Sequence, residues 1–116
     1  MTEQRSRTLC RWDELPDLAT RGFDLAPELG GQEIFIVRQG DRVYAYRNHC
    51  PHTGAPLDWQ PDQFLDVEQM FIQCAFHGAL FRITDGYCVR GPCAGQSLEA
   101  IAVKVDGGRV VLDDGH

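Results

Sequence analysis

Short runs in which apolar and polar residues alternate cover most of the chain, and Gly and Asp residues separate them. This two-residue period is typical of β-strands, whose side chains point to opposite faces in turn, and no run keeps the longer period of an amphipathic helix. Residues 32–38 and 42–47 flank the turn at 39–41 and predict a hairpin. In the first of these strands, Ile34 and Phe35 would begin two opposite apolar faces. The pattern therefore predicts an all-β fold.

Five further runs have the β-branched and aromatic composition of strands. They are residues 70–74, 80–84, 87–89, 98–105 and 109–112. Asp85-Gly86 would turn the chain between the second and third of these runs, and Asp106-Gly107-Gly108 between the last two. Gly adopts the positive φ angles of tight hairpin turns, so both sites are strong turn signals.

The length and composition indicate one ordinary globular domain. The 116 residues are 43% hydrophobic and 24% charged, and no repeat or linker divides them. We expect residues 1–116 to form a single domain in which the polar stretch 1–8 is disordered.

The charge and the N-terminus narrow the choice of partner and compartment. A formal net charge of -6 argues against nucleic acid and anionic membranes as partners and favours basic protein surfaces. No apolar run reaches the roughly 18 residues of a membrane span, and the first residues lack the apolar core of an export signal. These features predict a cytoplasmic protein.

Cysteine and histidine gather in two segments that do not have a strand pattern. The first contains Cys50-Pro51-His52 and the second Cys74-Ala75-Phe76-His77, while the chain has five cysteines in all. An odd count without an export signal favours metal ligation over a disulfide framework. Loops on a sheet scaffold could bring the two thiolates and two imidazoles together around a metal centre.

A structural zinc ion and an iron–sulfur cluster are the two candidates for this centre. Zinc modules commonly pair Cys with Cys and His with His at short range, whereas each short motif here is mixed. Mixed pairs suit two adjacent irons, because each loop can give its Cys to one iron and its His to the other. The spacing favours the cluster.

The two motifs resemble those of the Rieske family, C-x-H followed by C-x-x-H. Further similarities are the continuations His52-Thr53-Gly54-Ala55-Pro56-Leu57 and His77-Gly78-Ala79-Leu80-Phe81, the turn Asp85-Gly86, and Gly91-Pro92, which is similar to the family's cluster-covering proline loop. The resemblance extends from about Ile34 to Leu112. It implies three small antiparallel sheets and one [2Fe-2S] cluster held at an exposed tip by two loops, with Cys50, His52, Cys74 and His77 as ligands through the thiolates and the imidazole nitrogens nearest the backbone.

Two departures indicate which branch of the family the chain resembles. The high-potential branch adds a disulfide between the two loops, and Ala55 and Phe76 occupy the corresponding positions. Ala79 and Phe81 stand where that branch carries hydroxyl donors. The resemblance is therefore to the ferredoxin, oxygenase and nitrite-reductase small-subunit branch, at low potential.

The favoured function is electron transport, as a ferredoxin-like oxidoreductase component without a catalytic site. It would pass single electrons from a flavin or NADH-linked reductase to a terminal oxygenase or reductase. A fixed small subunit of a larger enzyme, of the nitrite-reductase type, is the alternative, followed by a zinc-binding interaction module. The sequence names neither the final substrate nor the oligomeric state.

Other cysteine, histidine and aromatic residues are expected to have ordinary structural roles. Cys10 should be a small buried residue, Cys88 and Cys93 should remain unlinked, and His49 should be exposed or hydrogen bonded. His116 ends the sequence, while Trp59 and Phe76 are expected to pack near the centre without carrying electrons.

Overall fold

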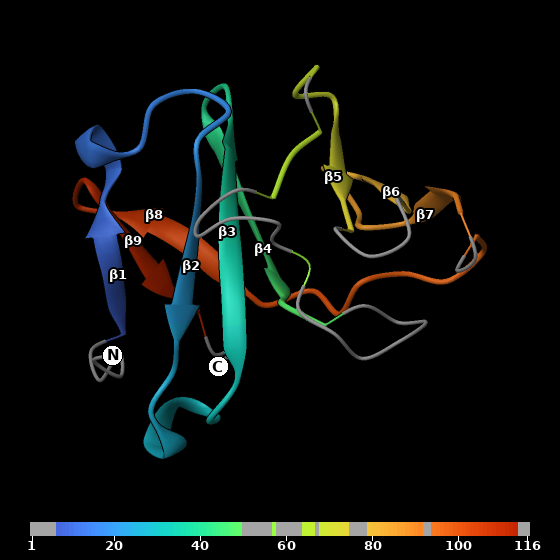
Figure 1. The fold of residues 1–116 in the computed structure, drawn as a ribbon. Helices are drawn as coiled ribbons and strands as arrows, with labels where there is room; N and C mark the ends of the chain where they lie inside the picture. The colour runs from blue at the N-terminus through green and yellow to red at the C-terminus, as the bar shows by residue number, and fades with distance from the viewer. Residues whose placement is uncertain are drawn as a thin grey trace.

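The computed structural model describes residues 7–49, 57, 64–66, 68–74, 79–91 and 94–113. Three antiparallel sheets of three strands each make up this part of the chain (Figure 1). Its elements are β1 (Thr8–Arg11), η1 (Trp12–Glu14), β2 (Thr20–Asp24), η2 (Pro27–Leu29), β3 (Glu33–Gln39), β4 (Arg42–Arg47), β5 (Phe71–Gln73), β6 (Leu80–Arg82), β7 (Cys88–Arg90), β8 (Val103–Asp106) and β9 (Arg109–Leu112). The predicted all-β fold of small antiparallel sheets is confirmed. No helix among these residues is long and apolar enough to cross a membrane.

The sheet β2-β3-β4 is the centre of the fold. Its hairpin β3–β4 pairs from Ile34 with Arg47 to Gln39 with Arg42, as predicted, and β3 lies one residue later than expected. Gly40 in the turn has a φ of +64°, which a residue with a side chain rarely adopts. The Gly40 N–H also donates to Asp17 Oδ1 at 2.8 Å. This bond ties the turn to the segment before β2.

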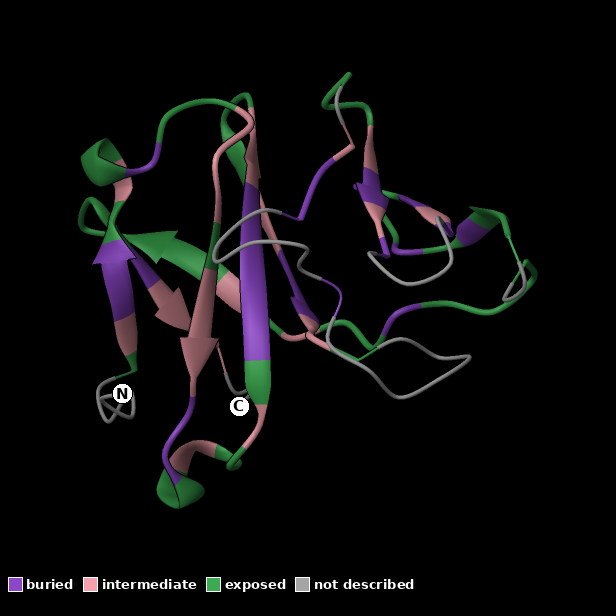
Figure 2. Cartoon of the chain, in the orientation of Figure 1, coloured by how far each residue is buried: buried purple, intermediate pink, exposed green. Residues whose placement is uncertain are grey.

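Strand β3 is buried on both faces, because a sheet lies on either side of it (Figure 2). Ile34 and Ile36 pack into a core with residues of β1 and β9, while Phe35 and Val37 pack into a second core with residues of β5, β6 and β7. These four side chains are at most 1% exposed. The two opposite apolar faces predicted from the sequence are confirmed.

The sheet β1-β9-β8 contains the predicted C-terminal hairpin, in which Asp106 pairs with Arg109. Its strand β8 begins at Val103, so the prediction of a strand over 98–105 was too long. Leu98 instead inserts into the core beside β5–β7. The next residues run along β4, where the Glu99 carbonyl accepts from the Arg47 N–H at 2.9 Å.

The prediction of disorder over residues 1–8 was wrong at its C-terminal end. Strand β1 begins at Thr8, and the Leu112 N–H donates to the Arg7 carbonyl at 2.8 Å. Pairing with β9 thus fixes a segment whose composition is polar, while residues 1–6 lie outside the described part. Strands β1 and β2 were both absent from the sequence prediction.

The third sheet, β5-β6-β7, is shorter than expected and carries the predicted turn at Asp85-Gly86. Gly86 has a φ of +72°, and a Cβ there would lie 2.8 Å from the Tyr46 ring. Asp85 accepts from Arg82 Nε and from the Tyr87 N–H, both at 3.0 Å. These hydrogen bonds, the one from Arg82 foremost, lower the pKa of the Asp85 carboxyl group. The turn therefore needs both its glycine and its carboxylate.

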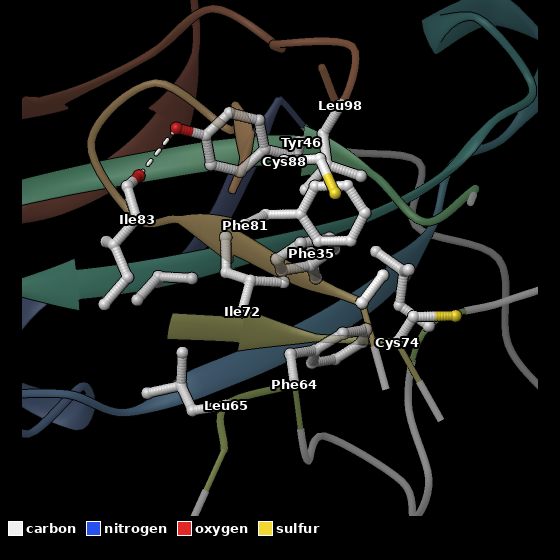
Figure 3. Packing of buried hydrophobic residues seen from close by; sticks show 13 residues of the cluster. Phe35, Tyr46, Phe64, Leu65, Ile72, Cys74, Phe81, Ile83, Cys88 and Leu98 are labelled. Atoms are coloured by element: carbon white, nitrogen blue, oxygen red, sulfur yellow. Dashed lines mark hydrogen bonds between the residues drawn. The ribbon is translucent and has the colours of Figure 1, made fainter. Parts of the chain in front are cut away.

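Tyr46 joins this small sheet to β4. Its hydroxyl donates to the Ile83 carbonyl at 2.6 Å, and the residue is 2% exposed (Figure 3). Its ring lies 5.9 Å from that of Phe35, which in turn stacks on Phe64 at 4.3 Å. Burial, together with the nearby Asp85 carboxylate, raises the pKa of Tyr46 well above its ordinary value. The phenol therefore stays protonated and holds the turn in place.

Tyr46→Phe should destabilise the protein by about 1–3 kcal/mol, because it leaves the buried Ile83 carbonyl without this donor. The loss should be full below about pH 10, where the phenol is protonated in both states, and should shrink as the pH rises, because the unfolded chain then ionises first. The shift of the urea midpoint measures it. Tyr44→Phe on the same strand, where Tyr44 is only half-buried, is the control and should stay within about 0.5 kcal/mol. Equal losses in the two variants would contradict the assigned role.

Candidate metal centre

The first predicted ligand loop leaves the scaffold at the end of β4. The Asn48 N–H donates to the Glu33 carbonyl at 2.8 Å, and Asn48 Oδ1 accepts from the Leu57 N–H at 2.6 Å. Leu57 is fully buried. Cys50 and His52 lie between these two anchored positions in the sequence, outside the described residues. Both ends of this loop are therefore fixed.

The second predicted loop connects β5 to β6. The Cys74 N–H donates to the Ala79 carbonyl at 2.9 Å, and both residues are fully buried. Figure 3 shows the Cys74 sulfur pointing away from Phe35 and Phe81 at the edge of the apolar cluster. His77 lies between Cys74 and Ala79, outside the described residues.

A third loop, after β7, begins with Gly91-Pro92. Gly91 has a φ of +107°, and a Cβ there would lie 2.8 Å from the Ala79 Cα. The Ala94 N–H donates to the Gly91 carbonyl at 3.1 Å and closes a turn. The base of this loop therefore rests directly on the end of the second loop, which only glycine permits. Pro92 lies outside the described residues.

The described ends of the two ligand loops meet in one hydrophobic core, to which Leu57, Cys74 and Ala79 all belong. The buried thiol of Cys74 fits a ligand of an iron–sulfur cluster, because bonding to a metal stabilises a thiolate at a site screened from water. Of the four predicted ligands only Cys74 is described. Accordingly, no group of three or more His, Cys, Asp or Glu residues gathers in the described ranges.

Three of the residues expected to have ordinary roles are described, and two of them, Cys10 and His49, behave as predicted. His49 is exposed, and Cys10 is buried, which raises the pKa of its thiol. Cys88 is fully buried, and its Sγ lies 3.2 Å from the Arg90 carbonyl oxygen, while the predicted absence of a link to Cys93 involves a residue outside the described ones. The others lie outside the described residues: Trp59, Phe76, Cys93 and His116.

The sequence prediction missed two features that hold the loops. One is the Asn48 side chain, which closes the first loop, and the other is the contact of Gly91 with Ala79. An Asn immediately before a ligand loop is a recognisable signal, because its side chain often accepts backbone N–H bonds at turns. The partner of Gly91 has no such signal, because it depends on tertiary packing.

Comparison with protein families matches residues 8–106 to the Rieske [2Fe-2S] domain. Among curated proteins, mouse apoptosis-inducing factor 3 is 29% identical over 85 residues, which are 73% of this chain and 13% of that protein. The terminal oxygenase component of carbazole 1,9a-dioxygenase from Sphingomonas sp is 32% identical over 68 residues, 59% of this chain and 17% of the oxygenase component. The chain thus spans a small part of these two relatives.

Solved structures are similar over most of the chain. The ferredoxin of carbazole 1,9a-dioxygenase from Nocardioides aromaticivorans IC177 has a TM-score of 0.69 and 32% identity, covering 97% of both chains. A chain of the complex of reduced oxygenase and oxidised ferredoxin in carbazole 1,9a-dioxygenase has a TM-score of 0.73 and 27% identity, covering 90% of this chain and 89% of its own. The Sphingomonas yanoikuyae B1 ferredoxin, at 21% identity and a TM-score of 0.71 over 95% of this chain and 99% of its own, shares the fold.

Proposed function

Because the chain belongs to the Rieske [2Fe-2S] domain family and binds one [2Fe-2S] cluster, we propose that it passes single electrons between larger redox proteins and catalyses no substrate reaction of its own. The likeness to the ferredoxin of a dioxygenase, over almost the full length of both chains, carries this proposal. A ferredoxin of this size needs only a cluster and a docking surface. Residues 1–116 would form one Rieske domain, within which the family match covers 8–106.

Four side chains would hold the cluster. Cys50 and Cys74 are the proposed ligands of one iron, and His52 and His77 those of the other, as the mixed pairs of a Rieske centre require. The burial of Cys74 and the anchored ends of both loops support this set. When bound, the cluster accepts and releases one electron.

The other residues of the site would set the conditions for electron transfer. Two neutral imidazoles in place of two thiolates make the site two charges less negative than a four-cysteine site, so adding an electron is easier. Leu57, Ala79 and Phe81 are fully buried beside Cys74 and exclude water from its inner side. Rigid packing there keeps the ligands in place in both redox states.

The partners would be a flavin or NADH-linked reductase and a terminal oxygenase. The similarity to a chain from an oxygenase–ferredoxin complex supports the second, and the net charge of -6 indicates a basic docking surface on each. We expect such a carrier to work in the cytoplasm, where thiols such as that of Cys88 stay reduced.

Metal analysis and electron paramagnetic resonance of the dithionite-reduced protein test the proposal. Two irons and two sulfides per chain with a rhombic Rieske signal are expected, followed by stoichiometric reduction by a reductase and oxidation by an oxygenase. A colourless zinc protein would refute it. Purification only as part of a stable larger enzyme would instead support a fixed subunit.

Electron transfer to the proposed partners should slow as salt rises, by about tenfold where long-range attraction steers the encounter. The net charge of -6 acts over a Debye length that is about 8 Å at physiological ionic strength. Stopped-flow reduction at several salt concentrations measures the effect. Rates independent of salt would count against a freely diffusing carrier.

A further inference from the structure

Asn48 lies between the end of β4 and the loop that carries Cys50 and His52. Hydrogen bonds to two neighbouring segments fix the backbone at this point. The Asn48 N–H donates to the Glu33 carbonyl of β3 at 2.8 Å, and the preceding Arg47 N–H donates to the Glu99 carbonyl at 2.9 Å. The residue that starts the loop therefore has a defined position on the scaffold.

The side chain of Asn48 joins the start of this loop to its end at Leu57. Its Oδ1 accepts the Leu57 N–H at 2.6 Å in a partly buried bond between residues nine apart. Leu57 is fully buried and packs in the same core as Cys74. Because Leu57 is buried, water could not easily take over its N–H if the Asn48 oxygen were removed.

We propose that Asn48 is a positioning residue of the cluster site, whose side-chain oxygen sets the path of the loop that carries Cys50 and His52. This proposal rests on the proposed function. One loop must present a thiolate to one iron and an imidazole to the other, and these two ligands are separated by a single residue. A small change in the path of the loop would therefore alter the geometry at both irons.

The turn at the other end of β4 offers a matched control. There the side-chain oxygen of Asp17 accepts the Gly40 N–H at 2.8 Å, a bond of the same kind that also links two segments. It closes no ligand loop. Asp17→Ala therefore removes a side-chain-to-backbone hydrogen bond of similar length at an exposed site, and reports the effect of losing such a bond away from the ligand loops.

The test compares Asn48→Ala, Asn48→Asp and Asp17→Ala as cluster-loaded proteins. Asn48→Ala should shift the g-values of the reduced cluster and the visible circular dichroism of the oxidised cluster. It should also speed cluster loss by about tenfold, the size expected for one partly buried hydrogen bond whose donor is left unpaired. Asn48→Asp keeps an oxygen at the same position and should restore the native g-values. Asp17→Ala should leave both spectra unchanged.

Unchanged spectra in Asn48→Ala would overturn the proposal while leaving the proposed function intact, because the wild-type signal establishes that function separately. Equal spectral changes in Asp17→Ala would also overturn it. If Asn48→Ala retains no cluster, Asn48→Asp decides: a native signal there supports the role of the oxygen, and a second loss of the cluster refutes it.

Discussion

A redox titration of the purified protein is expected to give a midpoint potential near -150 mV, the negative end of the range of roughly -150 to +300 mV that Rieske centres cover. Hydrogen bonds to the cluster sulfurs stabilise the reduced state and raise the potential. Ala79 and Phe81 occupy the two positions where high-potential Rieske proteins carry hydroxyl groups, and neither can donate. Both residues are fully buried in the same hydrophobic core as Cys74. Such a midpoint suits reduction by a flavin protein and excludes quinol oxidation.

Ala79→Ser and Phe81→Tyr should each raise this midpoint, by up to about 130 mV, because a hydrogen bond to a charged group contributes about 1.5–3 kcal/mol and a tenfold change is 59 mV for one electron. The two sites differ in the room they offer. Gly91 packs so closely on Ala79 that an added hydroxyl must point away from it. At Phe81 the added hydroxyl would enter a dry core, where it needs an acceptor.

Phe71→Tyr is the control for both variants. Phe71 precedes the inward-facing Ile72 on β5, so its half-buried side chain lies on the opposite face of the strand. A hydroxyl added there should leave the midpoint unchanged. A wild-type midpoint above roughly +100 mV, in the upper half of the family's range, would contradict the assignment to the low-potential branch.

The parts of the fold that could be predicted are those that local sequence determines. In β3 and β4 the alternating pattern and the turn between them suffice, because hairpin partners are neighbours in the chain. Strand β2 has no such pattern: it is the edge of its sheet, and β3 sets its register. At Leu98 an apolar residue was assigned to a strand although it fills a gap between sheets. Tertiary packing overrode the local signal there.

For the site, the sequence indicates the proposed ligand residues, but it does not indicate the contacts that hold their loops in place. The proposed ligand types and their spacing match what two irons would require, and short motifs around Cys50 and Cys74 carry them. The bond from Leu57 to Asn48 and the contact of Gly91 with Ala79 join residues nine or more apart through folded geometry. Sequence patterns do not show which residues form such contacts.

Replacing either proposed histidine ligand, His52 or His77, by Ala should abolish the native visible and paramagnetic spectra. Each loss opens one iron to solvent, and the remaining site would hydrolyse or accept a foreign ligand. Cys74→Ser should act in the same way, because it removes a fully buried sulfur at one end of the second predicted ligand loop. Iron and sulfide content together with the spectra measure the effect.

Two substitutions separate ligand loss from general damage to the site. His49→Ala removes an exposed imidazole three residues before His52 and should keep the spectra. Cys88→Ser keeps a donor for the Arg90 carbonyl at a fully buried position near the third loop, so the cluster should again remain. An unchanged rhombic signal in a His52 or His77 variant would remove that residue from the ligand set. A signal lost in His49→Ala and kept in the His52 variant would support His49 as the ligand in place of His52, because the proposed site takes one imidazole from each loop.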